Sequence, residues 1–400
     1  METRKVARIV VTGGHHTPAL AVIDSLKLIA GKEWDLRFFW LGHRHSMWKD
    51  KNDSAEYQEI SHRQIPFYEL TAGKWHASLN PLKLVRVPVG FWQAFKYLRQ
   101  IKPDLILSFG GYLAVPVCLI GRLLRITVIT HEQTFSPGKA NRLIGRFSEK
   151  VLLSWEGTER FFPHARTILT GLPLRRELWE VKDSPAPSPL ISSRVTKFVD
   201  AAKQSGLGLL YVTGGKQGSH DINEALSGTL ESLLEKAYIV HQCGANSVVR
   251  DHERLQKKRL ALREELQERY LLQDYFFAFD HLYLFKMADL VVSRAGANSV
   301  AEFSVLGTPV LLVPISWSSQ SEQYLNAKAL SKLGLAAILE EQNLNSQELY
   351  RQVVRLLGIS AQIKHDYREK SLGGVPHREA AQKASQEIME TLSSLAKADS

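Results

Sequence analysis

Short apolar runs rich in β-branched residues alternate with longer stretches of helical periodicity along most of the chain. Each run ends in glycine or in a polar turn. Because helices cover both faces of a parallel sheet, its strands are buried on both sides and read as continuous apolar runs. The pattern therefore predicts repeated βα units and parallel sheets.

The apolar runs form two series. The first is RIVVTGG, LRFFWLG, LILSFGG, ITVITHE, KVLLSWE and TILTGLP, and the second is GLLYVTGG, AYIVHQCG, DYFFAFD, DLVVSRAG, TPVLLVP and LAAILEE. Between them EVKDSPAPSPLISS, rich in proline and serine, predicts a linker and loop. We predict an α/β protein of two Rossmann-like, doubly wound domains, residues 1–175 and 176–375, whose carboxyl-end loops face a central cleft. A closing helix at about 376–397 would pack back on the first domain.

Composition narrows the class of protein. With 400 residues, 44% of them apolar, the chain can bury two cores. Cys118 and Cys243 alone make neither a disulfide framework nor a zinc site. Glycine interrupts the first apolar run, so no signal peptide is predicted, and no apolar run approaches the roughly 20 residues of a spanning helix. We expect a cytoplasmic protein that touches a membrane without crossing it.

The net charge of +10 favours anionic partners such as nucleotides, nucleic acid or anionic lipid. Residues 83–102 contain five basic residues and no acidic one, with aromatic residues at helical spacing. This pattern predicts an amphipathic helix on an anionic membrane surface, formed by Lys83, Arg86, Phe91, Trp92, Phe95, Lys96 and Arg99. The alternative is a solvated basic helix whose aromatic stripe faces the core.

Glycine pairs follow three predicted strands, at Gly13 and Gly14, at 110–111, and at Gly214 and Gly215. Glycine lets backbone amides approach an oxyanion, and the next helix start adds partial positive charge. A tight turn without a ligand is the alternative for any single pair. None completes a dinucleotide or P-loop motif, which makes those two interpretations weak.

His15 and His16 stand directly after the first glycine pair. Imidazole titrates near neutral pH, so a histidine in this turn suits removal of a proton from a sugar hydroxyl. An exposed loop histidine is the alternative.

The segment DLVVSRAGANSVAEF runs from a strand into a helix whose amides suit a diphosphate. Glu302 suits two ribose hydroxyls there, but Ser299 and Glu302 also match a capping box, which would explain both residues without a ligand. Further along, SSQSEQYLNA gathers amide side chains, including Gln323, that suit sugar hydroxyls; a solvated helix start is the alternative.

The ordered set TGGHHTPALAV, FGGYLAVP, HEQTFSPGKANR, GLPLR, VTGGKQG, RAGANSVAE and EQYLNA resembles the MurG family over roughly residues 6 to 345. The resemblance implies the glycosyltransferase B fold and inverting transfer of N-acetylglucosamine from UDP-N-acetylglucosamine to lipid I, the undecaprenyl-diphosphate-linked N-acetylmuramoyl-pentapeptide, giving lipid II for peptidoglycan. The implied partners are this donor, this lipid acceptor and the anionic inner face of the cell membrane, with no nucleic acid.

The resemblance also implies site residues, by position. His15 matches a histidine proposed to act in catalysis. Acceptor-side positions are Tyr112, His131, Glu132, Thr134 and Asn141. Donor-binding positions are Thr12, Gly13, Gly14, Arg175, Gly214, Gly215, Lys216, Gln217, Ala297, Asn298, Ser299, Val300, Ala301, Glu302 and Gln323.

The chain departs from the family pattern at a few of these positions. Val10 and Val11 replace a glycine pair, Thr134 and Leu172 replace asparagines, and Lys216 replaces a serine. The sequence has no D-x-D string, the motif that other glycosyltransferases use to hold a divalent ion on the diphosphate. We therefore expect no metal and no cofactor, with the leaving diphosphate stabilised by the helix that starts at Ala297.

Other functions share these features. A transferase acting on diacylglycerol or another lipid, or a sugar-nucleotide epimerase, would have the same fold and donor site. A non-catalytic sugar-nucleotide-binding or membrane scaffold protein would retain the fold, although His15 and Glu302 argue against it. A nucleic-acid binder would explain the charge, but no recognised nucleic-acid motif is present.

Overall fold

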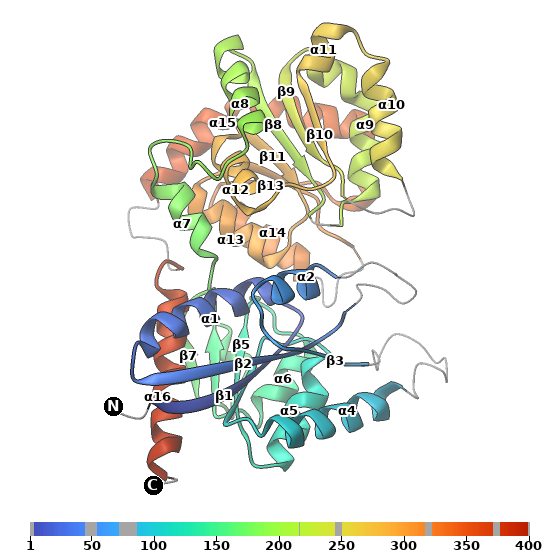
Figure 1. The fold of residues 1–400 in the computed structure, drawn as a ribbon. Helices are drawn as coiled ribbons and strands as arrows, with labels where there is room; N and C mark the ends of the chain where they lie inside the picture. Colours follow the sequence, from blue (N-terminus) through green and yellow to red (C-terminus); the bar gives the residue numbers. More distant parts are fainter. Residues whose placement is uncertain are drawn as a thin grey trace. The chain divides into compact units, whose positions relative to one another are not determined.

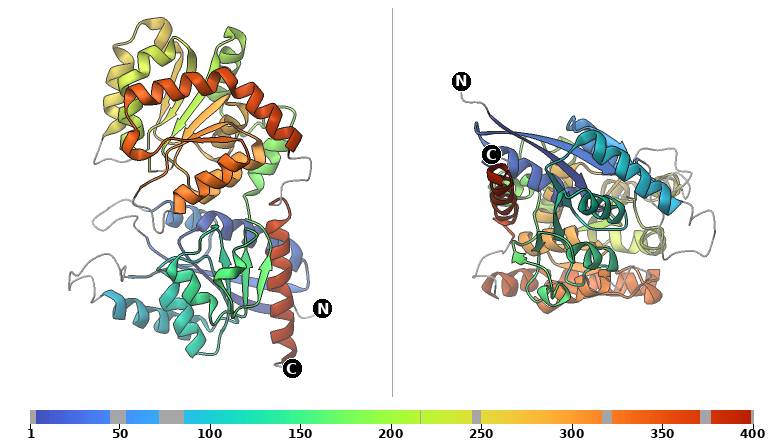
Figure 2. Two further views of the ribbon diagram at one scale, coloured as in Figure 1. Left: turned by 180° about the vertical axis from the view of Figure 1, so that it is seen from behind. Right: turned by 90° about the horizontal axis from the view of Figure 1, so that it is seen from below.

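The computed structural model describes residues 4–44, 54–71, 86–215, 217–244, 250–316, 322–370 and 377–398. The chain divides into two compact units. Unit 1 consists of residues 1–175 and 376–400, and unit 2 of residues 176–375. Each unit is built around its own parallel sheet with helices on both faces (Figures 1 and 2). This confirms the predicted α/β class with two parallel sheets.

The sheet of unit 1 has seven parallel strands in the order β3-β2-β1-β4-β5-β6-β7. The order reverses beside β1, as in doubly wound folds, and ligands in such folds bind outside the carboxyl ends of the strands at that point. The strands are β1 (Lys5–Thr12), β2 (Trp34–Gly42), β3 (Phe67–Glu69), β4 (Leu105–Ser108), β5 (Thr127–Glu132), β6 (Lys150–Leu153) and β7 (Thr167–Leu169). The hydrophobic pattern did not predict β3, a three-residue edge strand with no fully buried position.

Helices cover the two faces of this sheet with separate apolar cores. One core joins β1 and β4 to α1 and to the C-terminal helix α16, and the other joins the same strands to α4 and α5. Consecutive residues of β1, such as Ile9 and Val10, point into opposite cores, which explains the unbroken apolar run. The helices are α1 (His16–Ala30), α2 (Ala55–His62), α4 (Arg86–Ile101), α5 (Ala114–Leu123), α6 (Lys139–Gly145), the short η1 (Glu159–Phe161) and α16 (Ala380–Ala398).

Helix α16 lies along unit 1 although it closes the chain (Figure 1). Ile388 and Leu392 of α16 are buried in the same core as α1. Lys150, at the start of β6, is almost fully buried and donates to Glu387 Oε2 at 2.6 Å. The ion pair and the apolar face together fix this helix to unit 1.

The sheet of unit 2 has six parallel strands in the order β10-β9-β8-β11-β12-β13. Its strands are β8 (Gly208–Thr213), β9 (Ala237–Gln242), β10 (Tyr270–Gln273), β11 (Leu290–Ser293), β12 (Val310–Leu312) and β13 (Ala336–Ile338). Its helices are α7 (Arg176–Asp183), α8 (Ser193–Ser205), α9 (His220–Leu234), α10 (Asp251–Leu260), α11 (Glu264–Glu268), α12 (Ala278–Met287), α13 (Ala297–Leu306), α14 (Glu322–Lys332), the short η3 (Glu341–Asn343) and α15 (Ser346–Lys370).

One predicted strand of the second series is wrong. The segment DYFFAFD, predicted as a strand, is a loop that leads into α12. The strand at this point of the sheet is the preceding YLLQ, which forms β10. The aromatic residues of DYFFAFD have high strand propensity, but Phe276 is buried against Tyr211 and its backbone N–H donates to Gln242 Oε1. The side chains of this segment therefore fill a core at the end of the sheet instead of extending the sheet.

The segment that follows Arg175 belongs to unit 2. Residues 176–183 form α7, so the predicted linker and loop is wrong for 180–183, and only the proline-rich stretch after α7 is a loop. Lys286 of α12 donates to the carbonyl oxygens of Val181 and Ser184, which satisfies acceptors at the end of α7. Among the described residues, no helix is long and apolar enough to span a membrane.

Candidate active site

The first glycine turn of unit 1 is a point of close backbone approach between β1 and β4. Gly13 has φ of +141°, and a Cβ atom there would lie 2.8 Å from the Phe109 carbonyl carbon. Gly14 N–H donates to the carbonyl oxygen of Gly110 at 3.2 Å, which links two of the three predicted glycine pairs. Thr12 is buried, and its hydroxyl donates to the Leu41 carbonyl oxygen. Glycine is required here by the chain itself, whatever binds nearby.

His15 and His16 have different environments. His15 is the N-cap residue of α1, is half-buried, and its Nδ1 lies 3.4 Å from the carbonyl oxygen of Phe109 in the neighbouring turn. His16 pairs with Glu59 of α2, with Nε2 3.2 Å from the carboxylate oxygen. His15 thus lies where the two glycine turns meet, whereas His16 is held by its contact with α2.

The segment after β5 forms a buried polar network. Glu132 Oε1 accepts from the backbone N–H and the hydroxyl of Thr134, and its Oε2 accepts from Asn141 Nδ2 at 2.7 Å. Asn141 Oδ1 in turn accepts from the Thr130 hydroxyl. A Cβ atom at Gly110 would lie 3.1 Å from Asn141 Nδ2, so this network supports the second glycine turn from below. The threonine at position 134 is compatible with this arrangement because its hydroxyl reaches the carboxylate.

His131 is fully buried between two polar partners. Its Nε2 lies 3.1 Å from the Gly171 carbonyl oxygen, to which it donates, and its Nδ1 accepts from the Gln133 amide. Burial lowers the pKa of His131 to about 4. The neutral His131 ring, with a hydrogen bond at each nitrogen, therefore links β5 to Gly171 near the end of unit 1.

Glu56 of α2 is not among the site residues predicted from the sequence. Trp40 Nε1 donates to its Oε1 at 2.6 Å, and burial raises the pKa of Glu56 to about 7. Burial raises the pKa of Tyr112 on the second glycine turn, and the nearby Glu56 carboxyl raises it further. Nothing in the local sequence marks Glu56, because its burial depends on the indole of Trp40, sixteen residues away.

The glycine loop of unit 2 is packed against the loop that follows β9. A Cβ atom at Gly218 would lie 2.0 Å from the Cys243 carbonyl oxygen. Gly215, with φ of +83°, donates its N–H to the Thr213 hydroxyl, and its carbonyl accepts from Gln242. Gln217 is exposed on this loop, and Lys216 lies outside the described residues.

The start of α13 corrects one interpretation. The N-cap residue is Gly296, so Ser299 is the third helical residue and Glu302 lies in the second turn. A capping box would require Ser299 at the N-cap, and that alternative is wrong. No side chain caps this helix, and Asn298 Oδ1 is buried without a hydrogen-bond partner in the described structure. The first-turn amides of Ala297 to Ser299 therefore suit an anion.

Glu302 is buried, at 2% exposure, on the second turn of α13. Burial raises the pKa of Tyr211, and the charges of Tyr275, Asp280 and Glu302 raise it further. Val300 and Ala301 are also buried and belong to the core that supports the helix. The residues of α13 predicted to bind the sugar donor thus provide backbone N–H groups at the helix start and one buried carboxylate, that of Glu302, in the next turn.

Arg294 connects the loops at the carboxyl edge of this sheet. Its guanidinium pairs with Glu341 Oε1 at 2.7 Å and donates to the Ser219 hydroxyl and the Val313 carbonyl oxygen. Ser316 donates from its N–H and hydroxyl to the same Glu341. Burial acts to raise the pKa of Glu341, but the bonds from Ser316 and Arg294 together outweigh it and lower that pKa. This chain of bonds sets the positions of four neighbouring loops.

A cavity of about 220 Å³ lies beside these loops, at the ends of β12 and β13. Ile315, Ser316, Tyr324 and Glu341 are among its lining residues. Gln323, on the first turn of α14, accepts from the Ile315 backbone N–H at 3.1 Å. The glutamine predicted to contact the sugar therefore lies at the edge of this cavity.

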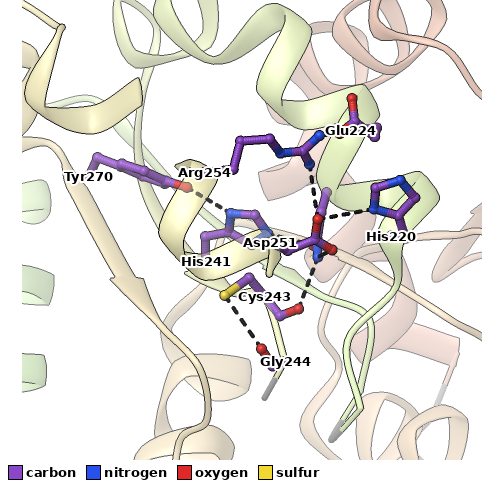
Figure 3. A network of polar contacts seen from close by, with 9 residues as sticks. His220, Glu224, His241, Cys243, Gly244, Asp251, Arg254 and Tyr270 are labelled. Atoms are coloured by element: carbon purple, nitrogen blue, oxygen red, sulfur yellow. Dashed lines mark hydrogen bonds and ion pairs between the residues drawn. The ribbon is translucent and has the colours of Figure 1, made fainter. Parts of the chain in front are cut away.

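A second polar network supports the glycine loop of unit 2 from α9 and α10 (Figure 3). Asn223 Nδ2 donates to Asp251 and to the Cys243 carbonyl oxygen, and Asn223 Oδ1 accepts from His241 Nε2. Burial lowers the pKa of His241 to about 3. His220 and Glu224 come close enough to Asp251 for a metal site, but Arg254 pairs with both carboxylates. The arrangement is explained by ion pairs that fix the loop.

The remaining predicted residues lie on the outer surface or at a boundary. Lys83 lies outside the described residues, and Arg86 begins α4. Trp92 and Phe95 are exposed by 63% and 44%, with Lys96 and Arg99 above their rings. The alternative of a stripe facing the core is therefore wrong for Trp92 and Phe95, whereas Phe91 is half-buried and Leu98 lies in the core.

Arg175 is the last residue of unit 1, with a half-buried side chain. Leu172, which stands at an asparagine position of the resembled family, is fully buried, and its N–H donates to His377 Nδ1 at 3.0 Å. The leucine is therefore a core residue of the segment that leaves unit 1.

Comparison with known proteins gives the same result for both halves of the chain. Residues 9–153 match the glycosyltransferase family 28 N-terminal domain, and residues 209–388 match the family 28 C-terminal domain. One relative is the UDP-N-acetylglucosamine--N-acetylmuramyl-(pentapeptide) pyrophosphoryl-undecaprenol N-acetylglucosamine transferase of Shouchella clausii. It is 32% identical over 87% of this chain and 90% of the relative's length. The transferase of the same name from Treponema denticola is 29% identical over 96% and 95%.

Solved structures show the same fold. Acinetobacter baumannii MurG aligns over 96% of this chain and 99% of its own with a TM-score of 0.64 and 23% identity. UDP-GlcNAc 2-epimerase from Neisseria meningitidis aligns over the same shares with a TM-score of 0.60 and 16% identity. The glycosyltransferase B fold is therefore confirmed. Together with the family 28 domains and the relatives above 30% identity, these findings show that the chain is a glycosyltransferase belonging to the MurG family.

Proposed function

We propose that this protein transfers N-acetylglucosamine from UDP-N-acetylglucosamine to lipid I and so produces lipid II. The observation that carries the proposal is that relatives matching both units over about nine tenths of their own length share this one named activity. The networks at the carboxyl edges of the two sheets support it, because each holds a glycine turn of the kind that suits phosphate or sugar ligands.

Unit 2 would hold the donor. The uncapped start of α13 offers amide donors and the positive end of a helix dipole to the diphosphate. Glu302 suits the ribose hydroxyls, and Gln323 at the edge of the neighbouring cavity suits the sugar. The same helix start would stabilise the charge that develops on UDP as it leaves, which is the largest contribution expected from such a site. We propose no metal and no cofactor for this step.

Unit 1 would supply the base. In an inverting transfer the acceptor hydroxyl attacks C1 of the donor sugar, its proton passes to a base, and the bond from C1 to the diphosphate oxygen breaks. His15 is half-buried beside both glycine turns, whereas His16 is paired with Glu59 and His131 has both nitrogens engaged. Among these three histidines, His15 is therefore the one proposed to take the proton.

The acceptor would be reached from the membrane surface. The exposed rings of Trp92 and Phe95, with the basic residues around them, form one face of α4. Aromatic rings enter the interface and basic side chains attract anionic headgroups, a combination typical of reversible membrane contact. We propose that the enzyme is peripheral on the inner face of the cell membrane.

A transfer assay with purified protein, UDP-N-acetylglucosamine and a lipid I analogue tests this function. We expect a disaccharide-bearing lipid product and release of UDP. Diacylglycerol as acceptor, and product analysis for UDP-N-acetylmannosamine, test the lipid glycosyltransferase and epimerase alternatives in the same preparation. Transfer to diacylglycerol but not to lipid I, or epimerisation without transfer, would reject the proposal.

A further inference from the structure

A second hollow of unit 1 lies away from the glycine turns. It has a volume of about 310 Å³ and is lined by the last turn of α6 and by residues 160–165, which lead into β7. Both segments come just before strands, toward the amino ends of β6 and β7, whereas the glycine turns follow the carboxyl ends of β1 and β4. The hollow is therefore separate from the residues assigned to catalysis.

Three arginines line this hollow, namely Arg142, Arg146 and Arg160. No carboxylate is among the described residues that line it. Within the described part of the chain, none of the three guanidiniums has an ion-pair partner, although Arg142 Nε donates to the Pro137 carbonyl oxygen. Like charges gathered without a counter-charge repel one another, and an anion would relieve that repulsion.

The ring of Phe161 packs against two of these arginines. The guanidinium carbons of Arg142 and Arg160 lie 4.4 and 4.8 Å from the centroid of the same ring, that of Phe161. Beneath it Phe162 is buried against Gly145, where a Cβ atom would lie 2.5 Å from the ring. Cation–π contact holds the guanidiniums in place before any ligand arrives, which lowers the entropy cost of binding.

We propose that this hollow, the α6–η1 pocket, binds a phosphomonoester group. The planar fork of arginine matches phosphate oxygens, and three guanidiniums suit the charge of about −1.5 to −2 that a phosphomonoester carries at neutral pH better than the single charge of a carboxylate. The group belongs either to a soluble phosphate compound or to a lipid with a phosphomonoester headgroup. Either source would give this unit an anion-binding site distinct from the one that binds the donor.

Titration calorimetry with inorganic phosphate, and co-sedimentation with phosphatidylcholine vesicles with and without phosphatidic acid, distinguish the two sources. The test variant is Arg160→Gln, because Arg160 makes no hydrogen bond to the described chain through its side chain. The matched control is Arg166→Gln, an exposed arginine six residues further on that does not line the pocket. Melting temperatures establish that both variants fold.

We expect Arg160→Gln to weaken binding of one of the two probes by about tenfold, as for loss of a charge-assisted bond, while Arg166→Gln changes it by less than about twofold. A loss of phosphate binding identifies a soluble ligand, and a loss confined to phosphatidic acid vesicles identifies a lipid headgroup. Binding of neither probe by the wild type, or equal losses in the two variants, would overturn the proposal, since the arginines would then act only as general surface charge.

Discussion

Replacing His377 by asparagine should change how the stability of unit 1 depends on pH. His377 is almost fully buried just before α16; its Nδ1 accepts from the Leu172 N–H and its ring packs edge-on against Trp155. An asparagine carbonyl oxygen can occupy the position of Nδ1 and keep this hydrogen bond. The variant therefore removes the titrating ring with little change in the backbone contact.

The magnitude follows from the pKa of the ring. Burial lowers the pKa of His377 from 6.5 to about 4. The unfolded chain therefore binds a proton at a pH where the folded chain does not, so this contribution to stability is complete above the unfolded pKa and is lost as the pH falls toward the folded pKa. At 1.36 kcal/mol for each unit, the loss between pH 7 and pH 5 is about 2 kcal/mol.

Asparagine has no such loss. At neutral pH the variant should be less stable than the wild type by about 1 kcal/mol, because the contact with the Trp155 ring is gone. At pH 5 the order should be reversed, with the variant more stable by about 1 kcal/mol, because the wild type has lost about 2 kcal/mol that the variant keeps. The buried rings of His131 and His241 add their own losses on acidification, but they are present in both proteins and cancel from the difference.

Urea unfolding followed by tryptophan fluorescence at both pH values measures this difference. His365→Asn, at an exposed position on α15, is the control for removing a histidine that is not buried. If the stability gap between wild type and His377→Asn is the same at the two pH values, the ring is not held neutral by burial and the reasoning fails.

Four further predictions follow from the site and the packing. His15→Ala should lower turnover at saturating substrates by roughly 10²- to 10⁴-fold, and His16→Ala should lower it much less; near-normal turnover in His15→Ala would show that the base is another group. Glu302→Gln should weaken UDP-N-acetylglucosamine binding in calorimetry by about tenfold with little change in melting temperature, and an unchanged dissociation constant would exclude the ribose contact. Trp92→Ala with Phe95→Ala should reduce binding to anionic vesicles, and wild-type binding should weaken with salt; vesicle binding that ignores salt and both changes would reject the α4 face. Glu387→Ala should destabilise unit 1 by about 3 kcal/mol because it leaves the buried Lys150 ammonium poorly paired, whereas Lys150→Met should be nearly neutral; urea midpoints in the reverse order would contradict this account.

Local pattern was sufficient for most of the fold. The apolar centres of β1, β4 and β8, residues 9–11, 105–107 and 209–212, are buried on both faces, so these strands are visible without knowing their neighbours. The glycine turns were equally visible, because Gly13 and Gly214 stand where another backbone passes too close for a side chain. The order of these turns along the chain also identified the family, which the relatives then confirmed.

Burial and partners were decided only by the tertiary structure. The sequence could not show that His131 is buried while His15 is only half-buried, because a ring is excluded from solvent by residues far away in the chain, such as Gly171. It could not exclude the capping box at Ser299, because the helix begins where the loop from Arg294 turns, and long-range bonds to Ser219 and Glu341 fix that loop. Glu56 and the α6–η1 pocket left no local pattern for the same physical reason. A side chain's charge state and accessibility are set by the elements packed against it, and the sequence lists those elements without placing them together.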